Sequence, residues 1–259
     1  MAEFTSEDLS GSRFEDVYLT GARFHDVDLR DARFSLVDLT GVTVRGALVV
    51  GAEISGEVKS LLVNGVDVAP LVEAELNRRY PDRALMRPAD ADGYRAAWAA
   101  LERLWPQTVQ RARGLDPELL HRQVDGEYSF IETLRHLVFA TDAWLLRAVL
   151  GQAAPWDPLD LPHDEMPDSP PVPRDRAARP TLDQVLALRA DRMASVRQVL
   201  AGLTDEQLRG MTEPVMEPGY PAPESYPVRR CLRAVLIEEW EHRLYAERDL
   251  DALEAQAGT

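Results

Sequence analysis

Two side chains that can bind a metal stand four residues apart near the C-terminus of the sequence. Glu238 and His242 belong to the stretch 230–250, which reads RCLRAVLIEEWEHRLYAERDL. Residues i and i+4 lie one above the other on a helix face, so this carboxylate and this imidazole could hold one ion together. Apolar residues recur here at roughly helical spacing without glycine or proline, which predicts a helix.

A third candidate ligand, His136, lies in another segment of helical character, over about residues 129–150. This segment reads SFIETLRHLVFATDAWLLRAVL, and Ser129 with Glu132 predicts a capping box at its start. A single histidine on an apolar helix face is more often a core residue than a ligand. Glu238 and His242 could likewise form only a surface ion pair. Together, however, the three residues could complete one metal site between facing helices.

Two histidines and one carboxylate form a ligand set that is used by catalytic zinc sites and by non-haem iron sites. Three protein ligands leave positions open for water or substrate, and a water or thiol bound there loses its proton more readily. Tyr245 and Asp249 continue the face of residues 238 and 242, so they could support the ligands or handle a proton. Glu239 and Glu241 point to other faces, where we expect them to be solvated.

The elements that would position these residues are predicted to be helices of an all-α four-helix bundle. Helices are expected over about residues 93–113, 129–150, from 181 onward and over 230–250. Two proline-rich connections, 151–179 and 213–227, separate the later helices. Residues 82–92 are interpreted as a linker, so we predict a bundle domain over residues 85–259 and a separate domain over residues 1–84.

The first 55 residues have a period of five, which fits neither a helix nor a strand. The apolar residues at this spacing are Phe4, Leu9, Phe14, Leu19, Phe24, Leu29, Phe34, Leu39, Val44, Val49 and Ile54. A fixed period of this kind indicates a solenoid in which each unit stacks its apolar residue on the next. A short hairpin turning at Asn64-Gly65 and a helix over about residues 71–80 are expected to cap it.

The composition restricts the function further. The chain has 259 residues and a formal net charge of −15, and no cluster of lysine and arginine offers a face for nucleic acid. There is no signal-like N-terminus and no apolar run near 18 residues, so we expect a cytoplasmic protein that does not bind a membrane. Cys231 is the single cysteine, so a metal would have to be held by histidines and carboxylates.

The N-terminal repeat resembles the pentapeptide-repeat family, whose units are built about a central Phe or Leu with a small residue two positions before it. The resemblance covers about a fifth of the chain. It implies a right-handed quadrilateral β-helix with four pentapeptides per coil. Some members of the family imitate DNA with an acidic surface, although such carboxylates could equally be the solvated outer face of any solenoid.

The segment SFIETLRHL, followed about a hundred residues later by EEWEHRLYAERDL, resembles the DinB and YfiT-like family of four-helix bundle metalloproteins. That resemblance implies a divalent metal, usually zinc or nickel, held at the positions of His136, Glu238 and His242. The sequence has Glu238 where the family has a histidine, so iron is also considered. The resemblance further implies transfer of a low-molecular-weight thiol of the mycothiol type, and a possible homodimer.

Two hypotheses about function follow. In the first, the chain is a metal-dependent small-molecule enzyme such as a thiol S-transferase. In the second, it is a non-catalytic interaction protein whose acidic solenoid binds a protein partner, with a vestigial metal site. Stoichiometric metal binding would favour the first, and salt-sensitive binding to a basic protein would favour the second.

Overall fold

The computed structural model describes residues 3–35, 37–56, 58–164, 166–167 and 169–257. The contacts divide the chain into two compact units, Met1–Gly56 and Glu57–Thr259. This division lies closer to the N-terminus than the domain boundary predicted between residues 84 and 85. That predicted boundary stays a prediction.

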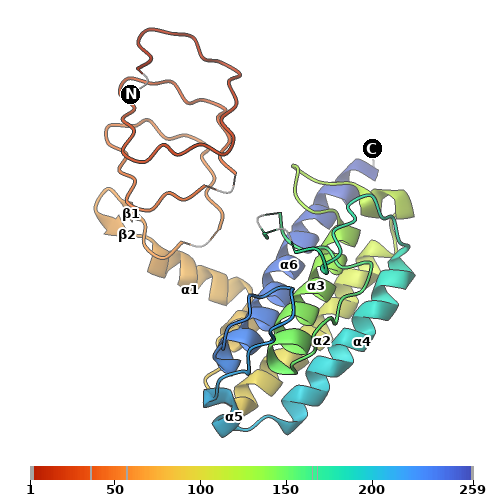
Figure 1. Ribbon diagram of the computed structural model, residues 1–259. Helices are drawn as coiled ribbons and strands as arrows, with labels where there is room; N and C mark the ends of the chain where they lie inside the picture. The colour runs from red at the N-terminus through yellow and green to blue at the C-terminus, as the bar shows by residue number, and fades with distance from the viewer. Residues whose placement is uncertain (1–2, 36, 57, 165, 168, 258–259) are drawn as a thin grey trace. The chain divides into compact units, whose positions relative to one another are not determined.

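The N-terminal unit turns at every fifth residue, as the sequence period requires. Residues with positive φ occupy successive corners, with glycine at Gly11 and Gly21 and aspartate at Asp16 and Asp26. Figure 1 shows the resulting coils. Within residues 3–35 and 37–56 there is no strand, and no backbone hydrogen bond joins one coil to the next. The apolar residues are exposed, with the Phe14 side chain at 61%. The expected buried inner stack is therefore not formed in these residues, and the β-helix stays a prediction.

A hairpin and a short helix follow, as predicted. Strands β1 (Leu62–Val63) and β2 (Val66–Asp67) pair antiparallel. Asn64 and Gly65 turn between them with φ of 50° and 84°, values that favour these residue types. Helix α1 spans Ala69–Arg79 with proline in its first turn. The linker predicted next is wrong in part, because residues Pro81–Met86 form a 3₁₀ helix, η1, and buried Met86 anchors it to the helical core.

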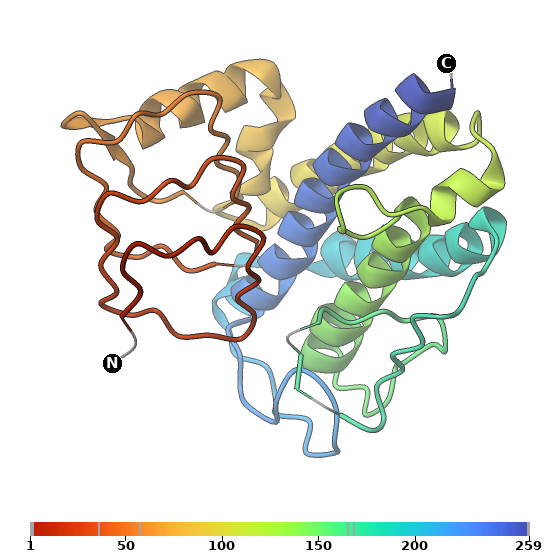
Figure 2. The ribbon, with the colours of Figure 1, turned by 90° about the horizontal axis from the view of Figure 1, so that it is seen from above.

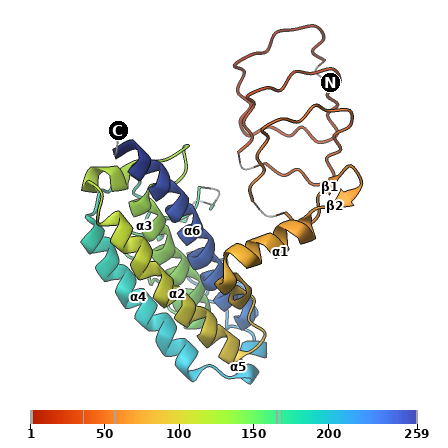
Figure 3. The same ribbon diagram turned by 180° about the vertical axis from the view of Figure 1, so that it is seen from behind.

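Long helices build the rest of the second unit, which confirms the predicted helical C-terminal domain. They are α2 (Ala91–Ala112), α3 (Phe130–Thr141), α4 (Leu182–Gly202) and α6 (Val228–Ala257), with the shorter η2 (Pro117–His121) and α5 (Asp205–Arg209). Figures 2 and 3 show the long helices lying side by side, and a continuous apolar core fills the space between them. Capping boxes start α3 at Ser129 and α4 at Thr181.

Helix α3 continues directly into a π-helical segment, η3 (Asp142–Val149). The apolar spacing predicts a single α-helix over about residues 129–150. The wider i→i+5 bonding of a π-helix shifts the side chains that follow it around the helix axis, and such segments often occur at functional sites. Asp142, at the start of η3, is fully buried.

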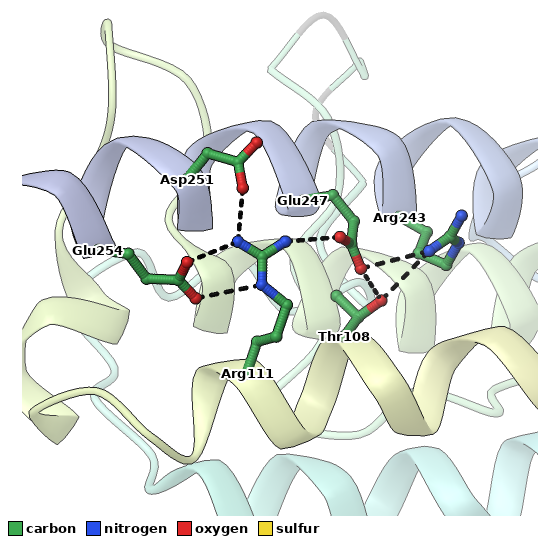
Figure 4. A network of polar contacts seen from close by, with 6 residues as sticks. All are labelled: Thr108, Arg111, Arg243, Glu247, Asp251 and Glu254. Carbon is green, nitrogen blue, oxygen red and sulfur yellow. Dashed lines mark hydrogen bonds and ion pairs between the residues drawn. The ribbon is translucent and has the colours of Figure 1, made fainter. Parts of the chain in front are cut away.

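Buried and partly exposed ion pairs hold α6 to its neighbours. Glu239 was expected to be solvated, but it is 1% exposed and forms a two-pronged pair with Arg189 of α4 at 2.6 and 2.5 Å. The expectation is wrong because Arg189, whose guanidinium lies over the Trp105 ring, supplies a buried partner for the carboxylate. Figure 4 shows a second network, in which Arg111 of α2 bonds to the carboxylates of Glu247, Asp251 and Glu254 on α6.

No helix in the described part of the chain is both long enough and apolar enough to cross a membrane.

Candidate metal centre

Helices α3 and α6 bring His136, Glu238 and His242 together, although His136 is about a hundred residues away in sequence. The carboxylate oxygen Oε2 of Glu238 lies 3.3 Å from His136 Nε2 and 3.2 Å from His242 Nδ1. The two imidazole rings are 4.7 Å apart between centroids. One potential ligand atom from each residue lies within 4.8 Å of the others, and no further group of this kind occurs in the described residues.

Backbone carbonyls fix the protonation pattern of both imidazoles. Nδ1 of His136 lies 2.9 Å from the Leu161 carbonyl, and Nδ1 of His242 lies 3.1 Å from the Glu238 carbonyl. A carbonyl oxygen can only accept, so each Nδ1 carries a proton and donates it. In a neutral imidazole the other nitrogen, Nε2, then carries a lone pair, and this is the pattern in which histidines bind metals.

The lone pair of His136 Nε2 faces a carboxylate oxygen of Glu238 at 3.3 Å. Two lone pairs at this separation repel each other unless a proton or a cation lies between them. Burial alone would raise the pKa of Glu238. With a proton on the nitrogen facing the carboxylate, however, this contact is a hydrogen bond, and hydrogen bonds and charge from His136 and His242 then more than offset the effect of burial. The pKa of Glu238 is therefore lowered, and the residue is an anion wherever the protein is folded near neutral pH.

The spacing of these atoms fits a bound ion. Two ligand atoms that each lie about 2.1 Å from zinc at a tetrahedral angle are about 3.4 Å apart, which is close to the 3.3 Å between Glu238 Oε2 and His136 Nε2. His136 is 5% exposed and held by packing, while the side chain of Glu238 is 32% exposed and can be reached from solvent. The residues present therefore fit a divalent metal with open coordination positions.

Aromatic rings surround the three side chains. The rings of Tyr128 and Phe139 lie 5.4 and 6.0 Å from that of His136. Tyr220 packs on Phe139 at 5.8 Å and on His163 at 5.7 Å. Burial raises the pKa of the Tyr220 hydroxyl, and the charge of Glu238 raises it further. His163 and Tyr220 come from the two proline-rich connections, so both loops contribute to the surroundings of the centre.

The two residues predicted to support the ligands have different positions. Tyr245 lies against His242, with ring centroids 5.8 Å apart, and the Arg248 guanidinium lies over the Tyr245 ring. Asp249 is buried and accepts a hydrogen bond from Arg248 at 2.8 Å, and no contact joins it to the three candidate ligands among the described residues. Burial raises the pKa of Asp249. The structure thus brings Tyr245, and not Asp249, next to the centre.

We did not predict from the sequence pattern that Tyr128, Tyr220, the Leu161 carbonyl and Arg135, which bonds to Leu159 O in the same loop, lie around the centre. Three of these depend on loops whose path is set by tertiary contacts. Arg135 gave a usable signal, since an arginine in the otherwise apolar run of α3, directly before a candidate ligand, must find buried partners.

The helical packing and the two-histidine, one-carboxylate cluster define the second unit as a helical domain with a potential divalent-metal centre. A family model for the DinB superfamily matches residues 100–246, more than half of the chain. The chain therefore belongs to the DinB superfamily, and a model for pentapeptide repeats matches eight copies over residues 4–52. No curated protein and no solved structure matches the chain significantly.

Proposed function

We propose that the protein binds one divalent metal ion through His136, Glu238 and His242 and uses it as a small-molecule enzyme. The observation that carries this proposal is the clustering of one potential ligand atom from each of the three residues within 4.8 Å, with Nδ1 of each histidine beside a backbone carbonyl. Membership in the DinB superfamily supports metal binding independently of this geometry. The fold proposed with it is a four-helix bundle joined to a quadrilateral β-helix of pentapeptide repeats.

Each ligand has a separate task. His136 and His242 bind as neutral donors, and Glu238 reduces the positive charge of the centre by one unit. The aromatic rings of Tyr128 and Phe139 shield His136 from water and limit its ring rotation. The bound ion would supply a Lewis acid that lowers the pKa of a water or thiol at neutral pH. Tyr245, whose pKa is raised by burial, keeps its phenolic proton and can donate it to a group held near His242.

The proposed reaction is transfer of a low-molecular-weight thiol of the mycothiol type to a small electrophile. A three-ligand centre with an open side suits this chemistry, because thiols bind zinc and nickel well and become nucleophilic when they lose the proton. Zinc or nickel is the proposed ion, with iron as the alternative that two histidines and one carboxylate also fit.

Elemental analysis of full-length protein purified without a metal-affinity tag tests the proposal. We expect about one zinc, nickel or iron per chain, lost in the His136→Ala, His242→Ala double variant. Glu238→Ala should also lose the ion. Glu241→Ala, three residues further along the same helix, should keep it. Loss of metal in Glu241→Ala, or metal retained in the double variant, would contradict the assigned ligands. Consumption of thiol with an electrophile, dependent on the ion, then tests the reaction.

A second candidate function is binding of a protein partner by the N-terminal repeats. The exposed apolar residues and the carboxylates of this unit favour it, because they leave a mixed apolar and acidic surface available. Salt-sensitive binding of a basic protein that persists in His136→Ala and is lost on deletion of residues 1–56 would support this function. Equal binding with and without residues 1–56 would exclude it.

A further inference from the structure

Arg135 is a fully buried cation that bonds to backbone carbonyls. Its Nε donates to Leu159 O at 2.8 Å, and its two terminal nitrogens donate to Ala178 O at 3.4 Å and Asp175 O at 2.6 Å. No carboxylate oxygen among the described residues accepts a hydrogen bond from it. A buried guanidinium is costly to desolvate, and these three bonds all fasten the first proline-rich connection to α3.

The same short loop segment orients the candidate ligand His136. Arg135 and His136 are consecutive in α3, and they bond to carbonyls of the same loop segment, Leu159 O and Leu161 O. The hydroxyl of Tyr128 donates to the next carbonyl, Pro162 O, at 3.3 Å. The segment 159–162 is thus held at three carbonyls. The middle one, Leu161 O, fixes the ring of His136. Movement of this segment would free Nδ1 of His136 and let the ring turn.

Arg147 provides a close comparison on the same continuous helix. It is 1% exposed and also donates to carbonyls, at Ala153 O, Val215 O and Glu217 O. Its bonds hold the start of the first connection and the second connection, and none of them reaches the segment 159–162. Arg135 and Arg147 therefore share burial and bonding type but differ in their relation to His136.

We propose that Arg135 is a positioning residue which, through the loop segment 159–162, holds Nε2 of His136 toward Glu238. Its role is to keep Leu161 O where it accepts the Nδ1 proton. Arg147 fixes loop geometry without setting the orientation of this imidazole. The part of the inference that concerns metal affinity rests on the proposed function, whereas the part that concerns the imidazole does not.

The test compares Arg135→Gln with Arg147→Gln in the full-length chain. Long-range ¹H–¹⁵N correlation of the imidazoles in metal-free protein reports which nitrogen of His136 carries the proton, with His136→Ala giving the assignment. We expect the Nδ1–H form in wild type and in Arg147→Gln, and a mixture of tautomers in Arg135→Gln. Zinc affinity, measured by competition with a chromophoric chelator, should fall about 10- to 100-fold in Arg135→Gln and change less than about twofold in Arg147→Gln.

The inference is overturned if Arg135→Gln keeps the Nδ1–H form, or if both variants change the tautomer equally, which would indicate a general loss of structure. If Arg135→Gln does not fold, Tyr128→Phe replaces it, because it removes the hydroxyl bond to Pro162 O and keeps the aromatic ring. It should shift the His136 signals toward the same mixture, and unchanged signals would overturn the inference. Absence of zinc binding by wild type would refute the proposed function, while the tautomer measurement would still decide the role of Arg135.

Discussion

A pair of buried carboxyls, Asp142 and Asp160, should make stability depend on pH in a way that one substitution removes. Asp142 at the start of η3 and Asp160 in the first connection are both fully buried. Arg192 of α4 pairs with Asp142 through two bonds, at 2.6 and 2.9 Å. Asp160 accepts a bond from the Asp157 amide through Oδ2, whereas its Oδ1 has no partner among the described residues. An oxygen without a donor suits a carboxyl that keeps its proton.

Burial raises the pKa of Asp160 to about 9, and the charge of Asp142 adds to this shift. The Asp157 amide and Arg192 act in the opposite direction but are weaker, and the Asp157 carboxylate raises the pKa slightly further. Burial also raises the pKa of Asp142, to about 6, against the pull of Arg192. Between about pH 6.5 and pH 8.5 the folded pair therefore holds about one proton, on Asp160.

The magnitude follows from proton linkage. The unfolded chain releases both protons near pH 3.8, so from about pH 6.5 to pH 8.5, where Asp142 is mostly ionised and Asp160 is not, the folded state binds about one proton more than the unfolded state. The stabilising contribution of a raised pKa is complete below the unfolded value and is lost as pH rises toward the folded value. The loss is about 1.4 kcal/mol per pH unit, or about 2.7 kcal/mol from pH 6.5 to 8.5.

Asp160→Asn removes this proton exchange while keeping an acceptor for the Asp157 amide and a donor for Asp142. Urea unfolding followed by tryptophan fluorescence reports on the helical unit, because all five tryptophans lie there. The free energy of unfolding of Asp160→Asn minus that of wild type should grow by about 1.4 kcal/mol per pH unit from pH 6.5 to 8.5. Asp191→Asn, at an exposed partner of Arg192, controls for removal of a carboxylate. A difference that stays constant with pH would refute a protonated Asp160.

Three further predictions concern charges on the helices. Glu239→Ala should lower the free energy of unfolding by about 3–5 kcal/mol, because it leaves the buried guanidinium of Arg189 without its partner; a urea titration showing under about 1 kcal/mol would contradict this. Arg111→Ala, at a partly exposed network, should cost only about 1 kcal/mol in the same titration, so a loss as large as that of Glu239→Ala would be unexpected. Glu238→Gln should weaken zinc binding at least about tenfold in a chelator competition, while Glu241→Gln should bind as wild type does.

The sequence predicted the elements that local chemistry determines. The capping box at Ser129 and the Asn64-Gly65 turn were recognisable because their hydrogen bonds lie within a few residues of sequence. The i, i+4 spacing likewise placed Glu238 and His242 on one face of α6. These features need no knowledge of the rest of the chain.

The features that were missed depend on partners distant in sequence. Glu239 and Glu241 have nearly the same local surroundings, and only Arg189, fifty residues earlier, makes one of them a buried partner. The start of the π-helix at Asp142 could not be predicted from the spacing of apolar residues, because that spacing does not distinguish i→i+4 from i→i+5 hydrogen bonding. The proline-rich loops follow the buried arginines of α3 and η3, so their course could not be predicted from composition.

The position of Glu238 supports the proposal that this residue is a ligand and not the trace of a lost site. A carboxylate freed from metal binding would gain most by turning to solvent, where its charge is hydrated. Oε2 of Glu238 instead lies 3.3 Å from His136 Nε2 and 3.2 Å from His242 Nδ1, and Nδ1 of His136 is held by the Leu161 carbonyl. This arrangement keeps the carboxylate within the cluster, which supports the proposed role of Glu238 as a ligand. With one carboxylate, that centre is also less positive than three histidines would make it, which favours ions that accept oxygen together with nitrogen, such as zinc and iron.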